Sequence, residues 1–97
     1  MNYSLHLKAS QDLDDAAAYY QKQAGNVLSQ AFLNEFEHSV ERLLRHPLLG
    51  SLWRKSKRKF VMPRFPYSII YTVFNNELRI FAVAHQSRRT AYWRGRI

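Results

Sequence analysis

The C-terminal end of the chain, residues 85–97, brings together the side chains best suited to chemistry or to target recognition. An imidazole can exchange a proton near neutral pH, and His85 stands where the last predicted strand ends. Arginines can contact phosphates, and aromatic rings can stack on bases or anchor a protein interface. We therefore predict a target-binding surface made of His85, Arg88, Arg89, Tyr92, Trp93, Arg94 and Arg96. The structural alternative makes His85 a hydrogen-bonding hinge and packs Trp93 on the sheet.

A second cationic group lies upstream of this tail. Its members are Arg54, Lys55, Lys57, Arg58, Lys59 and Arg64. Such a run can bind phosphates or an acidic protein segment, so it is a candidate anion-binding or partner-binding site. It can equally be a solvated loop whose charges keep an edge strand from aggregating. Both interpretations stay open at this point.

The charge of the chain is unevenly distributed. The formal net charge is +8. Residues 1–53 carry four Lys or Arg against six acids, a net charge of −2, whereas residues 54–97 carry eleven against Glu77 alone, a net charge of +10. One side of the molecule should therefore attract anions, either nucleic acid or an acidic protein.

Metal, thiolate and phosphate-loop chemistry find no support in the sequence. The chain has no cysteine and only three glycines, and the histidines (His6, His38, His46 and His85) lack the spacing of metal ligands. Three aspartates, at positions 12, 14 and 15, follow Ser10. A helix that begins at Ser10 would explain them, because the helix dipole favours negative charge in the first turn. We expect neither a metal nor a cofactor.

The elements that must position these residues can be read from hydrophobic patterning. Residues 2–8 alternate, with Tyr3, Leu5 and Leu7 on one face, which predicts a strand. Ser10 as N-cap and Gly25 as the closing residue bound a first helix. A second helix is predicted from about residue 27 to 45 by apolar residues at three- and four-residue spacing. The short connection between the two helices predicts an antiparallel helical hairpin.

The C-terminal half should form most of a sheet. Two apolar runs, residues 65–74 and 78–84, flank Asn75 and Asn76, which tolerate the positive φ of a tight hairpin turn. Residues 52–62 should begin as a basic loop and become a strand near residue 59. The fold class is therefore α+β, a helical hairpin packed on an antiparallel sheet with an N-terminal strand and a short basic C-terminal tail. We expect the core to contain Phe32, Phe36, Ile69, Tyr71 and Ile80.

At 97 residues the chain is a single domain, with room for one core. Its apolar runs are too short to cross a bilayer, and its first ten residues lack the apolar centre of a signal peptide. We therefore expect a cytoplasmic protein with no membrane partner.

Short motifs recur in order along nearly the whole chain. They are Ala9-Ser10, Asp12-Leu13, Tyr19-Tyr20, Phe32, Phe36, His46-Pro47, Gly50, the run FPYSIIY at 65–71, Val83-Ala84-His85, Arg88-Arg89 and Tyr92-Trp93-Arg94. No single motif is specific, but the ordered set resembles the ParE/RelE superfamily of small bacterial toxins from type II toxin–antitoxin modules. The resemblance implies the helical hairpin and antiparallel sheet already predicted.

Two activities divide this superfamily. RelE-like members cut mRNA on the ribosome with basic side chains and usually a C-terminal tyrosine, whereas ParE-like members poison DNA gyrase and are not known as nucleases. The RelE arginine on the central strand corresponds to Ser68 here. A second RelE arginine corresponds to a position near Ser87, beside Arg88, and the catalytic tyrosine to a position near Trp93, beside Tyr92. The serine at position 68 favours the ParE-like activity.

The resemblance thus implies a ParE-like toxin that inhibits growth by binding DNA gyrase, with the A subunit as its target, and that takes part in plasmid maintenance. It implies a cognate antitoxin as the neutralising partner and assigns no catalytic residue. The alternatives are a RelE-like mRNA endonuclease, with the ribosome and mRNA as partners, and a non-catalytic nucleic-acid-binding module.

Overall fold

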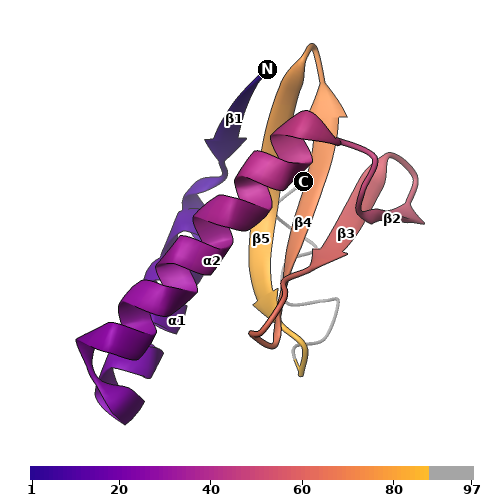
Figure 1. The fold of residues 1–97 in the computed structure, drawn as a ribbon. Coiled ribbons are helices and arrows are strands. Elements are labelled where there is room, and N and C mark those ends of the chain that lie inside the picture. Colours follow the sequence, from indigo (N-terminus) through magenta and orange to yellow (C-terminus); the bar gives the residue numbers. More distant parts are fainter. Residues whose placement is uncertain (88–97) are drawn as a thin grey trace.

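The computed structural model describes residues 1–87, and within them two helices cover one face of a five-stranded sheet (Figure 1). The strand order is β1-β5-β4-β3-β2. In chain order the elements are β1 (Asn2–Leu5), α1 (Leu7–Ala24), α2 (Asn26–Arg45), β2 (Ser51–Arg54), β3 (Lys57–Val61), β4 (Tyr67–Phe74) and β5 (Glu77–His85). The predicted α+β class and the helical hairpin on a sheet are confirmed. None of the helices in residues 1–87 is long and apolar enough to cross a membrane.

The central hairpin of β4 and β5 forms as predicted. Asn75 and Asn76 have φ values of 51° and 59°, so both residues adopt the left-handed conformation that a two-residue primed turn requires. Phe74 pairs with Glu77 across this turn, and the antiparallel pairing extends to Tyr67 and His85, with a shift of register between Ile70 and Tyr71. The hairpin therefore fixes the centre of the sheet and carries His85 to the end of β5.

The N-terminal strand is shorter than the alternation of its residues predicted. It ends at Leu5 because His6 caps α1, with its Nδ1 accepting the Lys8 N–H at 3.1 Å. Leu7 consequently lies in the helix and is 71% exposed, so its assignment to the buried face of a strand was wrong. β1 also runs parallel to β5, which makes the sheet mixed, whereas the other neighbouring pairs are antiparallel.

The first helix begins earlier than predicted. Ser10 is not its N-cap, since the Ser10 N–H already donates to the His6 carbonyl at 3.0 Å as part of the helix. The aspartates therefore lie beyond the first turn, and the dipole argument for them was wrong. The end of the helix is confirmed: Gly25 has φ 83° and donates its N–H to the Gln21 carbonyl at 2.8 Å. The second helix matches its predicted span to within one residue.

The basic stretch before residue 59 is a second hairpin, where a loop had been predicted. Ser51 pairs with Lys59 and Leu52 with Arg58, and Lys55 turns the chain with φ 49°. Charged residues hid this strand because β2 lies at the edge of the sheet, where alternate side chains can stay in water. The hairpin thus extends the sheet outward from β3 (Figure 1).

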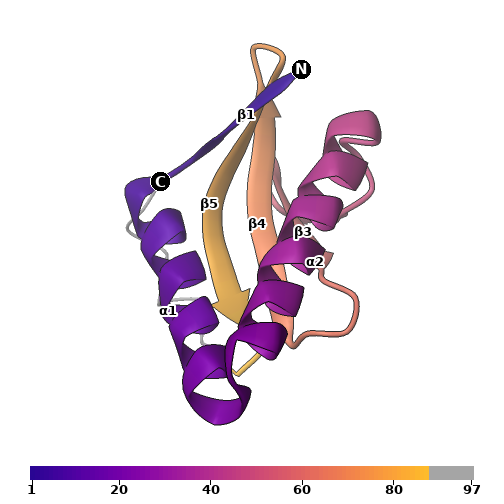
Figure 2. The same ribbon diagram turned by 60° about the vertical axis from the view of Figure 1, so that its left-hand side comes forward.

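The core lies between the helical hairpin and the sheet (Figure 2). The five residues predicted for it are all buried: Phe32, Phe36, Ile69, Tyr71 and Ile80. Tyr71 also ties the sheet to the loop after α2, since its hydroxyl donates to the Pro47 carbonyl at 2.7 Å and accepts the Gly50 N–H at 2.9 Å. Gly50 has no room for a side chain, because a Cβ there would lie 2.7 Å from that hydroxyl oxygen.

Candidate functional site

His85 is the member of the predicted target-binding surface that lies within the described residues. The remaining six lie outside them: Arg88, Arg89, Tyr92, Trp93, Arg94 and Arg96. His85 is the last residue of β5 and is half-buried. The structure therefore places His85 at the end of β5, beside α1.

The imidazole of His85 is held in a defined orientation. Its Nδ1 accepts the Ser87 N–H at 3.0 Å and lies 2.8 Å from the Ser87 hydroxyl oxygen. A backbone N–H can only donate, so Nδ1 carries no proton and the neutral ring holds its proton on Nε2. The ring meets Tyr67 edge-on, with 5.1 Å between the ring centroids. These contacts hold the ring against Ser87 and Tyr67 at the end of β5.

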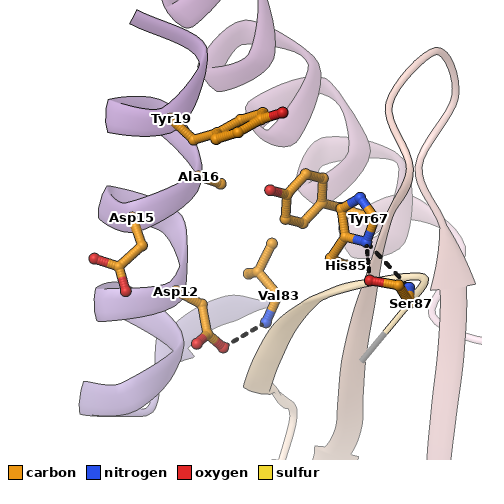
Figure 3. Close-up of a pocket in the computed structure, with 8 residues that line it drawn as sticks. All are labelled: Asp12, Asp15, Ala16, Tyr19, Tyr67, Val83, His85 and Ser87. Carbon is orange, nitrogen blue, oxygen red and sulfur yellow. Dashed lines mark hydrogen bonds between the residues drawn. The ribbon is translucent and has the colours of Figure 1, made fainter. Parts of the chain in front are cut away.

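A pocket of about 350 Å³ opens beside His85, between α1 and β5 (Figure 3). It is lined by Asp12, Asp15, Ala16, Tyr19, Tyr67, Val83, His85 and Ser87. The four helical residues fall at three- and four-residue spacing and therefore share one face of α1. The pocket thus joins a polar helix face to the end of the central hairpin.

Asp12 is the residue at this site that the sequence reasoning missed. It is 6% exposed, and its Oδ2 accepts the Val83 N–H at 3.1 Å. The bond has a structural cause. β1 ends opposite Ile80, so within residues 1–87 no strand pairs with the following part of β5 on that side, and α1 packs there. A signal was present in the sequence, because position 12 falls on the same helix face as Ala9 and Ala16, which are both buried.

The structure places the basic residues of the second predicted group in three different environments. Arg58 is structural, since its guanidinium donates to the Gly50 carbonyl at 2.8 Å and to the Leu48 carbonyl at 3.3 Å. Arg64 lies in the loop before β4, 3.7 Å from the Glu35 carboxylate. The β2–β3 hairpin brings the others together on the outer part of the sheet: Arg54, Lys55, Lys57 and Lys59.

An aromatic ring accompanies these cations. The Arg54 guanidinium lies 4.5 Å from the centroid of the Trp53 ring, and Trp53 packs on a small cluster formed by Ile70, Ala82 and Ala84. This cluster lies on the sheet face opposite the helices, because neighbouring residues along β4, such as Ile69, belong to the helix-covered core. The hairpin therefore offers positive charge next to an aromatic ring, a combination that suits an acidic or phosphate-bearing partner.

Ser68, the position at which the resemblance predicted an arginine in RelE-like members, is buried in β4. It is 2% exposed and pairs with Val61 and Ala84, and among the described residues its hydroxyl has no hydrogen-bond partner. A group buried in this way is not placed to contact a substrate. Within residues 1–87, no three His, Asp or Glu side chains gather closely enough to hold a metal ion.

Comparison with known proteins points to one family. The model of the family described as "ParE toxin of type II toxin-antitoxin system, parDE" matches residues 3–90. Among solved structures, one described as "Chromosomal ParDE TA system from P. aeruginosa" superposes with a TM-score of 0.77 at 20% sequence identity, covering 88% of this chain and 95% of that one. At this identity the match supports the fold alone. Comparison with curated protein sequences gives no significant match.

Proposed function

Because the chain belongs to the ParE toxin family of type II toxin–antitoxin systems, we propose that it inhibits DNA gyrase by binding and is neutralised by a cognate antitoxin. The observation that carries this proposal is the family match over residues 3–90. Gyrase, through its A subunit, is the target that ParE-like activity implies. The protein then needs affinity for its target and no catalytic group of its own.

The environment of Ser68 supports a binding toxin over a nuclease. Cleavage of RNA requires groups that transfer protons and stabilise charge at the scissile phosphate. At the position of the RelE arginine on the central strand, this chain has a small neutral side chain that is 2% exposed. An arginine there would have to place its charge in a buried site beside Ala84 and Val61, which is energetically unfavourable without a partner.

The predicted surface beyond β5 carries the proposed toxicity, with His85 as its organiser. Arg88, Arg89, Trp93 and Arg94 are the leading residues, and they lie outside the described residues. In a binding toxin each cation contributes part of the affinity, so single substitutions should weaken inhibition gradually. In a nuclease, loss of one proton-transferring group should abolish the chemistry in one step.

An activity assay on single variants tests this proposal. Purified wild type, Arg88→Ala, Arg89→Ala and Trp93→Ala are compared in gyrase supercoiling and in ribosome-dependent mRNA cleavage. Arg79→Ala is the matched control, since Arg79 is an exposed cation of β5 that pairs with Glu77 at 2.8 Å. We expect gyrase inhibition that fades stepwise across the three variants and stays unchanged in the control. Cuts in mRNA at codon spacing, lost in one step, would replace the proposal with the RelE-like alternative.

The antitoxin should supply an acidic or amphipathic segment that lies across the β2–β3 hairpin and the helical hairpin. The β2–β3 hairpin carries the cations Arg54, Lys55, Lys57 and Lys59. Exposed apolar side chains on and after the helices could anchor an amphipathic segment, notably Val27, 85% exposed, and Leu48, 71% exposed. Positive charge on one partner and negative charge on the other accelerates their encounter.

The salt dependence of association tests this second part. The antitoxin is taken as the product of the adjacent gene, and its association rate with the toxin is measured at about 0.05 and 0.3 M salt. We expect the rate to fall by about tenfold or more, because steering between unlike charges is screened. A rate that does not change with salt would remove the electrostatic component, and gyrase inhibition would be unaffected by that result.

A further inference from the structure

The β2–β3 hairpin carries cations whose charge no carboxylate of the described chain balances. Residues 50–76 contain six lysines and arginines and no acidic residue. Four of the six lie on this hairpin: Arg54, Lys55, Lys57 and Lys59. Within residues 1–87 none of the four forms an ion pair, whereas the exposed Arg79 of β5 pairs with Glu77 at 2.8 Å. The charge of the hairpin is therefore left for an anion from outside.

Two of these cations face each other directly across the two strands. Arg54 pairs with Lys57, and residues paired in this way share one face of the sheet, with Cβ atoms about 4.5–5.5 Å apart. Lys59 lies on the same face two residues further along β3, opposite Ile70, which belongs to the cluster on the face away from the helices. Like charges directly opposite each other destabilise a strand pair. An anion bound between them would remove this repulsion, so the arrangement indicates an anion-binding surface.

Contacts within the sheet hold these cations in fixed positions. The Arg54 guanidinium lies 4.5 Å from the centroid of the Trp53 ring. The turn of the hairpin is tied to β4, since the Thr72 hydroxyl donates to the Ser56 carbonyl at 2.8 Å. Lys55 has a φ of 49°, a conformation that residues other than glycine rarely adopt. Charges that only protect a sheet edge from aggregation need no such constraints, because a mobile lysine protects it equally well.

We propose that this face of the hairpin binds duplex DNA through its phosphates, without reading the base sequence. Duplex DNA carries one negative charge for about every 1.7 Å of its axis, so several phosphates meet the grouped cations at once. Arginine and lysine side chains make such contacts in protein–DNA complexes. An acidic protein strand fits less well, because it gains affinity by pairing with a sheet edge. Lys57 and Lys59 offer no edge, since β3 is paired with β2 on one side and with β4 on the other.

The anion has to come from another molecule, because residues 88–97 contain four arginines and no acidic side chain. The choice of duplex DNA over RNA rests on the proposed function, since gyrase acts on duplex DNA. The antitoxin is proposed above to cover the same hairpin, so the free toxin is the form that contacts DNA.

Fluorescence anisotropy of a short labelled duplex, titrated with full-length protein at several salt concentrations, tests the site. Wild type is compared with Lys57→Gln and Lys59→Gln. Each variant loses one phosphate contact, so the slope of log K against log salt concentration should fall by about one. At about 0.1 M salt each variant should bind about five- to tenfold more weakly, with an unchanged melting temperature. Absence of binding by the wild type at about 0.05 M salt would overturn the proposal.

Lys22→Gln is the matched control. Lys22 is an exposed cation in the last turn of α1, and the helices cover the other face of the sheet (Figure 2). The variant removes the same charge and should leave affinity and salt slope almost unchanged, because charges more than about 10 Å away are largely screened at 0.1 M salt. Equal losses in all three variants would show that net charge alone attracts DNA, and would overturn the assignment to the hairpin.

A polyglutamate peptide separates DNA from an acidic protein partner. It is added as a competitor at the same concentration of negative charge as the duplex, and we expect most of the DNA to remain bound. Displacement of most of the DNA would assign this face to an acidic protein and overturn the proposal. Gyrase is absent from these assays, so their failure would refute this inference and leave the proposal of gyrase inhibition unaffected.

Discussion

Replacing Tyr71 by phenylalanine should destabilise the protein through two hydrogen bonds, with little change in packing. The Tyr71 ring is fully buried, and its hydroxyl joins the Pro47 carbonyl at 2.7 Å to the Gly50 N–H at 2.9 Å. These bonds attach the loop after α2 to the central strand. Phenylalanine keeps the ring and removes only the oxygen, so the effect reports on the hydrogen bonds.

The magnitude follows from what each partner loses. The Gly50 N–H is left buried without an acceptor, which costs about 1–3 kcal/mol. The Pro47 carbonyl is only partly buried and can turn to water, so its loss is closer to the net value of one bond, about 0.5–1.5 kcal/mol. Together these give about 2–4 kcal/mol out of a total of about 5–15 kcal/mol for a small domain. For a domain of this size, at about 4–8 °C per kcal/mol, the melting temperature should fall by about 10–30 °C.

Urea and thermal denaturation of Tyr71→Phe measure this loss directly. Tyr3→Phe is the matched control, since it removes the same oxygen from a ring that is 44% exposed, and it should change stability by less than about 0.5 kcal/mol. A Tyr71→Phe protein as stable as the Tyr3→Phe control would refute the assignment of the hydroxyl as the tie between loop and sheet.

Three further predictions concern the core, the α1–β5 contact and the pH dependence of stability. Phe36→Ala should lower the free energy of unfolding by about 3–5 kcal/mol, because removal of a side chain that is 3% exposed leaves a cavity. Val27→Ala, at an exposed site, is the control and should have the melting temperature of the wild type. An unchanged melting temperature in Phe36→Ala would show that the predicted helix register is wrong. Asp12→Ala should lower the free energy of unfolding, measured in urea, by about 1–3 kcal/mol, because the Val83 N–H loses its acceptor. An equal decrease in Asp14→Ala would contradict this explanation. Burial raises the pKa of Tyr71 above its ordinary value of 10.0, partly offset by the Gly50 hydrogen bond and by Arg58. The protonated Tyr71 hydroxyl therefore contributes to the free energy of unfolding. This contribution is fully present below about pH 10 and is lost as the pH rises through the pKa of Tyr71 in the folded protein. Wild-type unfolding free energy should therefore fall more steeply than that of Tyr71→Phe between about pH 9 and 11, and parallel curves would argue against the raised pKa.

The parts of the fold that the sequence predicted correctly are those with strong local signals. Asn75 and Asn76 are among the few residues that accept positive φ, so the turn between β4 and β5 could be placed to the residue. The apolar residues of α2 likewise recur at helical spacing over the whole segment, so the sequence predicted both the helix and the face that it buries. In both cases local preference and tertiary packing favour the same conformation.

The errors arose where a tertiary contact decided between local alternatives. Residues 6–10 carry both a strand-like alternation and a helix cap. The pairing of β1 with β5 ends at Ile80, and the His6 cap then starts the helix. The charged run before residue 59 reads as a loop until its partner strand is known, because an edge strand can expose its polar side chains.

Of the candidate site, the sequence predicted the position of His85, whereas the pocket beside it was not predicted. The position of His85 at the end of a strand could be inferred from the apolar run before it. The buried role of Asp12 could not, because it depends on Val83, 71 residues away in the chain. A single acid at helical spacing has many possible roles, and only the packing of α1 on β5 selects this one.

Inhibition of gyrase by the purified protein tests the central claim most directly. Relaxed plasmid, ATP and gyrase are incubated with increasing amounts of the wild-type toxin, and supercoiling is followed on agarose gels. We predict that supercoiling stops as toxin approaches the concentration of gyrase, and that it recovers when the antitoxin is added. Full supercoiling at a large molar excess of folded toxin, whose melting transition is intact, would contradict the assignment of gyrase as its target.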